Sequence, residues 1–159
     1  MPPSDALTGG CQCGAVRFRA GRLGRSAICH CRMCQKAFGN VFAPLVTAYD
    51  VEWTRGTPKY FRSSNVLQRS FCGDCGTPLG CLDDDGMLEL AVGAFDDPAA
   101  AAPSVQFNMR DRVAFFDDLA SLPPQPDADK ELSCNARIVS RQHPDHDTAH
   151  WPPAGGFAA

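Results

Sequence analysis

The stretch Phe71-Cys72-Gly73-Asp74-Cys75-Gly76 contains a C-x-x-C turn, which directs two thiols into one site. Gly73 and Gly76 allow the tight turn and leave backbone N–H groups free to face the sulfurs. A second pair occurs in Cys11-Gln12-Cys13-Gly14, where residues i and i+2 of an extended chain share a face. Together the two cysteine pairs predict a closed site of four thiols with the tetrahedral geometry of structural zinc.

A third cluster, Cys29-His30-Cys31-Arg32-Met33-Cys34, offers three more thiols. Cys29 and Cys31 share a face by the same period of two, and Cys34 returns through a turn. Three protein ligands leave the fourth zinc position open to water or substrate, which is typical of catalytic zinc, so we expect a second zinc here. His30 is an alternative fourth ligand. If residues 29–31 are extended, its side chain points away from both sulfurs and packs beside the site instead.

Nine cysteines in 159 residues is a high and odd number, so complete intramolecular pairing is excluded. The segment Met1–Asp5 has no basic region and begins no apolar stretch, which argues against secretion. We therefore expect the reducing cytoplasm, where clustered cysteines more often bind metal. Disulfides, a redox C-x-x-C and a single shared structural site remain alternatives. Cys81 is expected in the core, and Cys134 as a free thiol of the tail.

Composition favours one folded domain, or one domain with a tail, because 44% of residues are hydrophobic and 21% are charged. No apolar stretch approaches the roughly twenty residues of a membrane span. The net charge of −3 provides no electrostatic footprint for nucleic acid or anionic lipid. We expect neither as a partner.

Short strands dominate the expected secondary structure. In residues 14–20, Val16 and Phe18 share one face while Arg17 and Arg19 share the other. A turn at 83–86 separates the two arms of a hairpin. Further strands are expected at 41–48, 51–53, 59–61, 66–71 and 104–109, and the only helix at 32–38. The fold is therefore mostly β with short antiparallel strands and little helix, a type that often needs a metal staple.

The composition changes at Leu122, where a Pro-rich linker begins. We expect residues 1–122 to form the zinc-binding domain and 123–159 to form an arm that is extended, partly disordered or draped over the body. If the arm instead packs as part of the core, Trp151 is its expected anchor. His143, His146 and His150 have helix-like spacing. A solvated tail is favoured over a third metal site there.

The order of these motifs resembles the glutathione-dependent formaldehyde-activating enzyme family, which is related to centromere protein V. The resemblance rests on four segments between about residues 9 and 122, namely 9–16, 29–36, 71–79 and 92–98. It implies a small β-tent fold with two zinc ions. One would be held by Cys11, Cys13, Cys72 and Cys75, and the other by Cys29, Cys31 and Cys34.

The resemblance also implies a carbon–sulfur lyase activity that joins glutathione to formaldehyde, giving S-hydroxymethylglutathione. A thiolate is the nucleophile, and zinc with an open position would lower the thiol pKa or polarise the aldehyde oxygen. Arg32 and Lys36 flank the three-cysteine cluster and could meet the carboxylates of glutathione, or could be solvated surface charges. A non-catalytic zinc-stabilised binding module and chemistry on a different glutathione adduct remain alternative functions.

Overall fold

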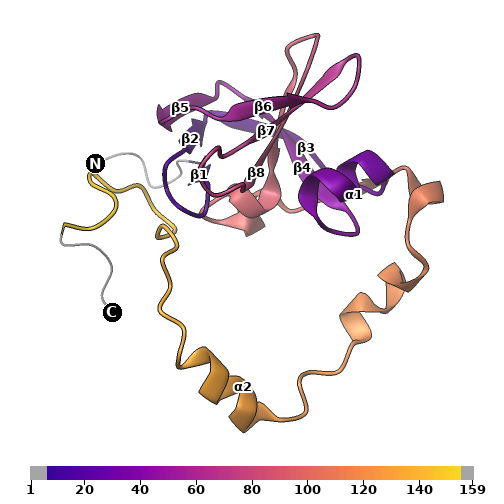
Figure 1. Cartoon of the computed structure of the whole chain (residues 1–159). Coiled ribbons are helices and arrows are strands. Elements are labelled where there is room, and N and C mark those ends of the chain that lie inside the picture. Colours follow the sequence, from indigo (N-terminus) through magenta and orange to yellow (C-terminus); the bar gives the residue numbers. More distant parts are fainter. Residues whose placement is uncertain (1–6, 155–159) are drawn as a thin grey trace.

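The computed structural model describes residues 7–154, so the segment Met1–Asp5 lies outside the described residues. Within 7–154 ten strands alternate with few helices, which confirms the mostly β fold (Figure 1). The strands are β1 (Leu7–Gly10), β2 (Arg17–Ala20), β3 (Arg22–Cys29), β4 (Ala43–Tyr49), β5 (Glu52–Arg55), β6 (Lys59–Arg62), β7 (Leu67–Phe71), β8 (Pro78–Asp83), β9 (Leu88–Ala91) and β10 (Val105–Phe107). The helices are α1 (Arg32–Phe38), α2 (Ala128–Asn135) and the 3-10 helices η1 (Val92–Ala94), η2 (Pro98–Ala101), η3 (Met109–Asp111) and η4 (Ala114–Ser121).

The strands form two sheets. The smaller sheet has the order β1-β2-β5, and the larger has the order β10-β3-β4-β9-β8-β7-β6. All pairs are antiparallel except β10 with β3, which run parallel. The expected antiparallel arrangement therefore holds for every described pair but this one, because a long connection returns the chain to the far edge of β3.

The main core fills the space between the two sheets. Phe18 of β2 is fully buried and contacts Trp53 and Phe95 edge to face, with ring centroids 6.0 and 5.1 Å apart. Val46 and Leu90 of the larger sheet complete this cluster from the other side. The face of β2 that carries Phe18 is thus the buried face that the sequence alternation predicts.

The opposite face of the larger sheet carries a second, smaller cluster. Leu45 precedes Val46 in β4 and so points to the other face of the sheet. It packs there with Cys34, Ala43 and Cys81. Helix α1 covers one end of this face, and the remainder is open.

Helix α1 begins and ends where the sequence predicts. Its N-cap is Cys31, whose sulfur accepts a hydrogen bond from the backbone N–H of Cys34. Its C-cap is Gly39 at φ 57°, a left-handed conformation that glycine adopts without strain. The cap therefore fixes Cys31 and Cys34 on the same end of the helix.

Two strands, one α-helix and the four 3-10 helices were not expected from the sequence. The strand β3 is the longest of the described strands, but Gly24 and two arginines break the alternation that would have revealed it. The short β1 contains two glycines, and α2 lies in the region expected to be an extended arm. Tertiary pairing, rather than local preference, forms β1 and β3.

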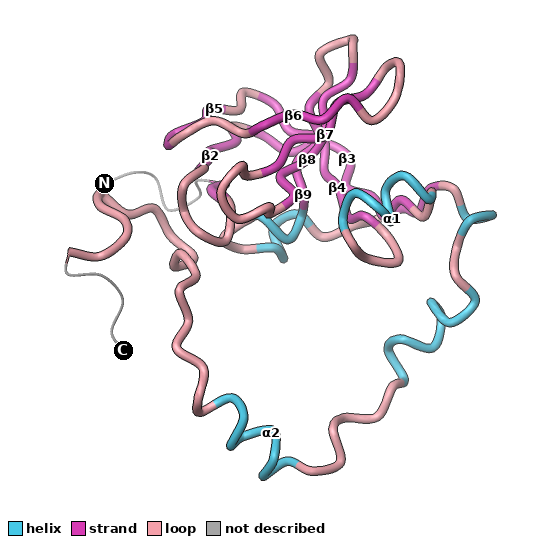
Figure 2. The backbone as a smooth tube through the Cα atoms, viewed as in Figure 1, coloured by secondary structure: helices cyan, strands magenta, loops and turns pink. Residues whose placement is uncertain are grey.

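Past η3 the chain stays against the body as far as Phe116 of η4, whose ring contacts those of His30 and Phe42. It then makes a wide excursion before returning beside β1 and β2 (Figure 1). Along the excursion the helical segments are short (Figure 2). Apolar side chains such as Leu122, Leu132 and Ile138 are exposed there. Residues 142–151 return to the body and contact it; we call this segment the strap. Among residues 7–154 no helix has the length and apolar character to cross a membrane.

Candidate metal centres and the adjoining cavities

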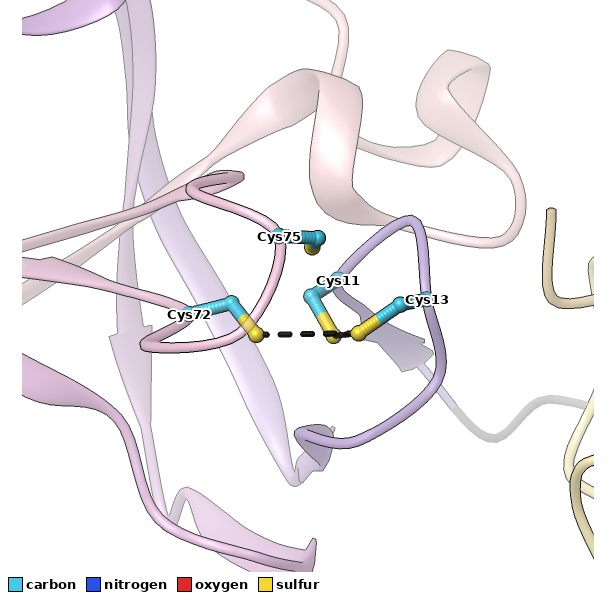
Figure 3. A group of neighbouring side chains, drawn as sticks. All are labelled: Cys11, Cys13, Cys72 and Cys75. Atoms are coloured by element: carbon cyan, nitrogen blue, oxygen red, sulfur yellow. Dashed lines mark hydrogen bonds between the residues drawn. The ribbon is translucent and has the colours of Figure 1, made fainter. Parts of the chain in front are cut away.

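Four thiols converge between the C-x-C loop and the C-x-x-C turn (Figure 3). The Sγ atoms of Cys11, Cys13, Cys72 and Cys75 all lie within 4.8 Å of one another. The Sγ atoms of Cys11 and Cys13 are 3.5 Å apart, and those of Cys13 and Cys72 are 3.8 Å apart. A tetrahedron with zinc–sulfur bonds of about 2.3 Å has edges of about 3.8 Å. The donor set and its spacing therefore fit a zinc ion, and the structure brings together the four residues that the sequence groups.

Backbone N–H groups point at these sulfurs, as the glycine-rich turns predict. Val16 donates to the Sγ atom of Cys11 across 3.2 Å, and Asp74 donates to that of Cys72 across 3.4 Å. Gly76 has φ 77° and donates its N–H to the carbonyl of Cys72, which closes the turn. Such donors stabilise thiolates over thiols, which favours a metal.

The thiol of Cys75 lies at the exposed edge of this group. Burial opposes its ionisation, but hydrogen bonds from Thr77 and Cys13 outweigh that effect and lower the pKa of Cys75 to about 6. For Cys13, burial dominates and raises the pKa to about 12. One thiol is thus prepared to ionise at neutral pH, while another needs a cation to do so.

The strap holds the C-x-C loop from outside. Trp151 donates from Nε1 to the carbonyl oxygen of Cys13 across 2.7 Å, and His143 donates its backbone N–H to the carbonyl of Gln12 across 2.8 Å. The rings of His143 and Trp151 lie edge to face over Gly14, where an added Cβ would come within 2.8 Å of either side chain. Trp151 therefore contacts the body, the place expected of it if the arm packs there.

An ion-pair network joins the strap to β2. Arg17 is 3% exposed and donates from Nη1 to Asp96 across 2.8 Å and from Nη2 to Asp147 of the strap across 2.7 Å. The sequence placed Arg17 on the polar face of its strand, and the strap covers that face. His146 and His150 take no part in a described metal-ligating group, and the imidazole of His143 bonds to Pro144 and Thr148, so the three histidines form no third site.

The second cluster is also assembled. The Sγ atoms of Cys29, Cys31 and Cys34 lie within 4.8 Å of one another, at the junction of β3 and α1. Burial raises the pKa of the Cys34 thiol, and the neighbouring Arg69 charge opposes this only in part. For Cys31, hydrogen bonds from Cys34 outweigh burial and lower the pKa. Three thiols without a fourth protein ligand among the described residues fit a zinc ion with one open position.

Two further residues contact this cluster, and the sequence analysis missed both. Arg69 donates from Nη2 to the Sγ atom of Cys34 across 3.3 Å, and Asn108 donates from Nδ2 to that of Cys29 across 3.2 Å. Arg69 lies in an alternating strand and Asn108 in a loop, so neither carries a local signal of a site. Only the pairing of β7 and β10 with the rest of the sheet brings them here.

His30 does not join the thiols. It is fully buried, its Nε2 atom bonds to the side-chain oxygen of Gln106 across 2.9 Å, and its ring packs edge to face against Phe116 with centroids 4.7 Å apart. His30 therefore packs beside the site. This is what the alternation of side chains in an extended segment 29–31 predicts.

A cavity of about 270 Å³ adjoins the three thiols on the open face of the larger sheet. Arg69, Cys81 and Glu89 form one cross-strand row along it, on β7, β8 and β9. The thiol of Cys81 points to Glu89, with Sγ 3.6 Å from Oε2, and burial together with the Glu89 charge raises the pKa of Cys81 to about 12. Among the described residues that line this cavity, Glu89 is the one carboxylate. Cys81 is buried, as expected, but it also faces the cavity.

A larger groove of about 620 Å³ lies between α1 and strands β6 to β8. Arg32 and Lys36 line it from α1, so the structure places both near the three-thiol cluster. Met33 and Arg69 line the groove and the thiol cavity alike and form the wall between them.

The remaining cysteine, Cys134, is exposed on α2, and all nine cysteines are free thiols, which gives the disulfide alternative no support.

Comparisons with known proteins concern mainly the body of the chain. The family model described as glutathione-dependent formaldehyde-activating enzyme matches residues 6–111, about two thirds of the chain, including all seven clustered cysteines. No curated protein matches the chain. A crystal structure of a Rhodobacter sphaeroides protein is similar to 63% of this chain and to 99% of its own, at 19% sequence identity and a TM-score of 0.49. The strap and the excursion lie outside the family match.

Proposed function

From the premise that this chain belongs to the glutathione-dependent formaldehyde-activating enzyme family, we propose that it is a zinc-dependent carbon–sulfur lyase. In the forming direction it joins glutathione to formaldehyde and gives S-hydroxymethylglutathione. The observation that carries the proposal is the three-thiol group of Cys29, Cys31 and Cys34, which lacks a fourth protein ligand among the described residues and adjoins a cavity. A purely structural site is closed by four ligands, as the other group is.

Two zinc ions per chain follow from this proposal. Cys11, Cys13, Cys72 and Cys75 hold the structural ion, and the three-thiol group holds the catalytic one. When bound there, zinc would offer an open position beside the cavity and would lower the pKa of a thiol in it. Three thiolates leave the ion a weak Lewis acid, so thiol capture is favoured over polarisation of the carbonyl.

Glutathione binding is assigned to the groove beside α1. Arg32 and Lys36 line it, and neither forms an ion pair with a described carboxylate. They are therefore available for the two carboxylates of glutathione. Because the groove shares Met33 and Arg69 with the thiol cavity, a tripeptide held there can place its sulfur close to the cavity.

Glu89 is assigned the proton transfer. The incoming thiol gives its proton to the Glu89 carboxylate, and the thiolate attacks the formaldehyde carbon. The carbon–sulfur bond forms as the π electrons of the carbonyl move to oxygen, which then takes the proton back from Glu89. The cycle leaves Glu89 unchanged and needs no other reactant.

The partner of this chemistry is a small-molecule thiol, and the cytoplasm is the compartment where glutathione and free cysteines are kept reduced. Nothing in the charge balance points to nucleic acid.

Exchange spectroscopy by NMR tests the proposal. Glutathione, formaldehyde and their adduct exchange without help, so the zinc-loaded protein should raise the exchange rate at least about tenfold above the uncatalysed rate. Elemental analysis should give two zinc ions per chain. Protein with two bound zinc ions and no acceleration would leave the non-catalytic binding module as the function.

A further inference from the structure

The groove beside α1 is more apolar than a formaldehyde adduct requires. Its walls include Met33, Phe38, Phe61, Phe71 and Pro78. Phe61 on β6 is 63% exposed and Met33 on α1 is 51% exposed, so two large apolar side chains of the same groove face solvent. The hydroxymethyl group of the formaldehyde adduct contains a single methylene and a hydroxyl, so it has little hydrocarbon surface to bury.

The charges in the groove have one sign. Arg32, Lys36 and Arg69 line it, and no aspartate or glutamate stands among its described lining residues. This charge pattern complements an anionic ligand rather than a neutral or cationic one.

Two buried polar groups along the groove lack partners. Arg69 is 6% exposed, and its Nε and Nη1 atoms have no hydrogen-bond partner, while its Nη2 atom bonds to Cys34. The hydroxyl of Ser70, which is 1% exposed, has none either. Buried polar groups are normally satisfied, so these atoms are exceptions, and they lie beneath the accessible surface of the groove rather than on it.

We propose that the groove binds an S-substituted glutathione whose substituent carries hydrocarbon or aromatic surface. Its carboxylates pair with the cations, and its substituent packs against Phe61 and the neighbouring rings. The inference rests on the proposed function, because it takes the ligand class from the glutathione adducts on which that function acts. It specifies an electrophile larger than formaldehyde.

Binding of two thioethers to the zinc-loaded full chain tests the proposal by isothermal titration calorimetry. S-Hexylglutathione and S-methylglutathione carry the same charges and no free thiol, and they differ by five methylenes. The hexyl compound should bind at least tenfold more tightly. Tenfold is about 1.4 kcal/mol, which burial of about two methylenes supplies.

Substitutions separate the apolar and charged parts of the site. Phe61→Ala should remove most of the preference for the hexyl compound, whereas the matched control Phe115→Ala, an exposed aromatic on η4, should retain it. Lys36→Gln should weaken both thioethers by a similar factor of about three to ten, whereas Lys130→Gln on α2 should not.

Equal affinities for the two thioethers would overturn the proposal, and so would a hexyl preference that survives Phe61→Ala. If Lys36→Gln binds both thioethers with unchanged affinity, the proposed pairing of the ligand's carboxylates with the groove's cations is wrong. Thioether binding requires no turnover, so a protein without lyase activity can still show the preference for the hexyl compound. A protein with lyase activity but equal affinities for the two thioethers would contradict this proposal and leave the proposed function standing.

Discussion

Arg69 and Cys34 come from a strand and a helix 35 positions apart, and the Nη2 atom of Arg69 donates a hydrogen bond to the Sγ atom of Cys34 across 3.3 Å. Three thiolates around one Zn²⁺ carry a net charge of −1, which a buried guanidinium neutralises. The pairing explains why a cation is retained in a nearly inaccessible position. It also places a fixed positive charge between the three-thiol cluster and the groove.

Replacement of Arg69 should therefore weaken metal binding at one site only. In Arg69→Gln, the three-thiol site should lose zinc to a competing chelator at a ten- to hundredfold lower concentration, because a hydrogen bond to a charged group contributes about 1.5–3 kcal/mol. The four-thiol site should keep its zinc. Arg62→Gln, which breaks an exposed pair with Asp84 of the β8–β9 turn, is the control. Equal zinc retention in both variants would show that Arg69 has no part in holding the ion.

The two thiol groups should respond differently to loss of one ligand. Cys13 and Cys72 are 59 positions apart, so zinc at the four-thiol site cross-links distant parts of the body and its binding energy becomes folding energy. Cys72→Ser should give insoluble or molten protein, whereas Cys34→Ser should stay folded with one zinc and no lyase activity. Zinc analysis and thermal unfolding measure both. A Cys72→Ser protein with native unfolding and two zinc ions would disprove the structural role.

Removal of the Glu89 carboxylate should slow catalysis without affecting metal content. General acid–base groups typically contribute about 10²–10⁴-fold, so Glu89→Gln should lower kcat by about 10² or more. Asp85→Asn, an exposed turn residue of the β8–β9 hairpin, should leave kcat unchanged. If Glu89→Gln keeps the wild-type kcat, another group or solvent accepts the thiol proton.

The cysteine groups and α1 could be predicted from the sequence because their signals are local. The spacing of Cys11 and Cys13, or of Cys72 and Cys75, sets which thiols meet, and a tetrahedral ion needs two such pairs. Gly39 marks the end of α1 by its cap conformation alone. These features depend on a few neighbouring residues.

Residues that become neighbours only through sheet pairing could not be predicted. Arg69, Cys81 and Glu89 form one row because β7, β8 and β9 align in a particular register, which no local pattern specifies. The ion pair that joins the strap to β2 was equally hidden. Asp147 is one acid among several in a polar tail until it meets Arg17, 130 positions away.

The contacts of His143 should make stability depend on pH. Burial lowers the pKa of His143, and the charges of Arg17 and Arg55 add to this effect, so the opposing bond to the Pro144 carbonyl is outweighed. The unfolded chain therefore takes up this proton near pH 6.5 and the folded chain only at lower pH. The contribution to stability is present above about pH 6.5 and is lost as the pH falls through the folded value.

Calorimetry at pH 7.5 and 5.5 with saturating zinc measures this effect. His143→Gln should show a smaller fall in Tm between the two pH values than the wild type does, whereas His150→Gln, at an exposed position, should match the wild type. An equal fall in all three proteins would assign the pH dependence to other groups.

Deletion of residues 123–159 should retain both zinc ions but lower stability, because all seven clustered cysteines precede the deletion while the strap contacts are lost. Those contacts include the bonds from Trp151 to Cys13 and from His143 to Gln12, and the Asp147 pair with Arg17. At about 0.5–1.5 kcal/mol each, they total about 2–4 kcal/mol, or roughly 5–15 °C in Tm.

Two point variants locate the effect within the arm. Trp151→Phe keeps a ring over Gly14 but cannot donate to Cys13, so it should show part of the loss and release zinc faster from the four-thiol site. Leu132→Ala, exposed on α2, should show neither. An unchanged Tm in the deletion would make the strap contacts energetically irrelevant. Failure to fold or to bind zinc would instead make the arm part of the core, since Arg17 would then have lost both its cover and its second carboxylate.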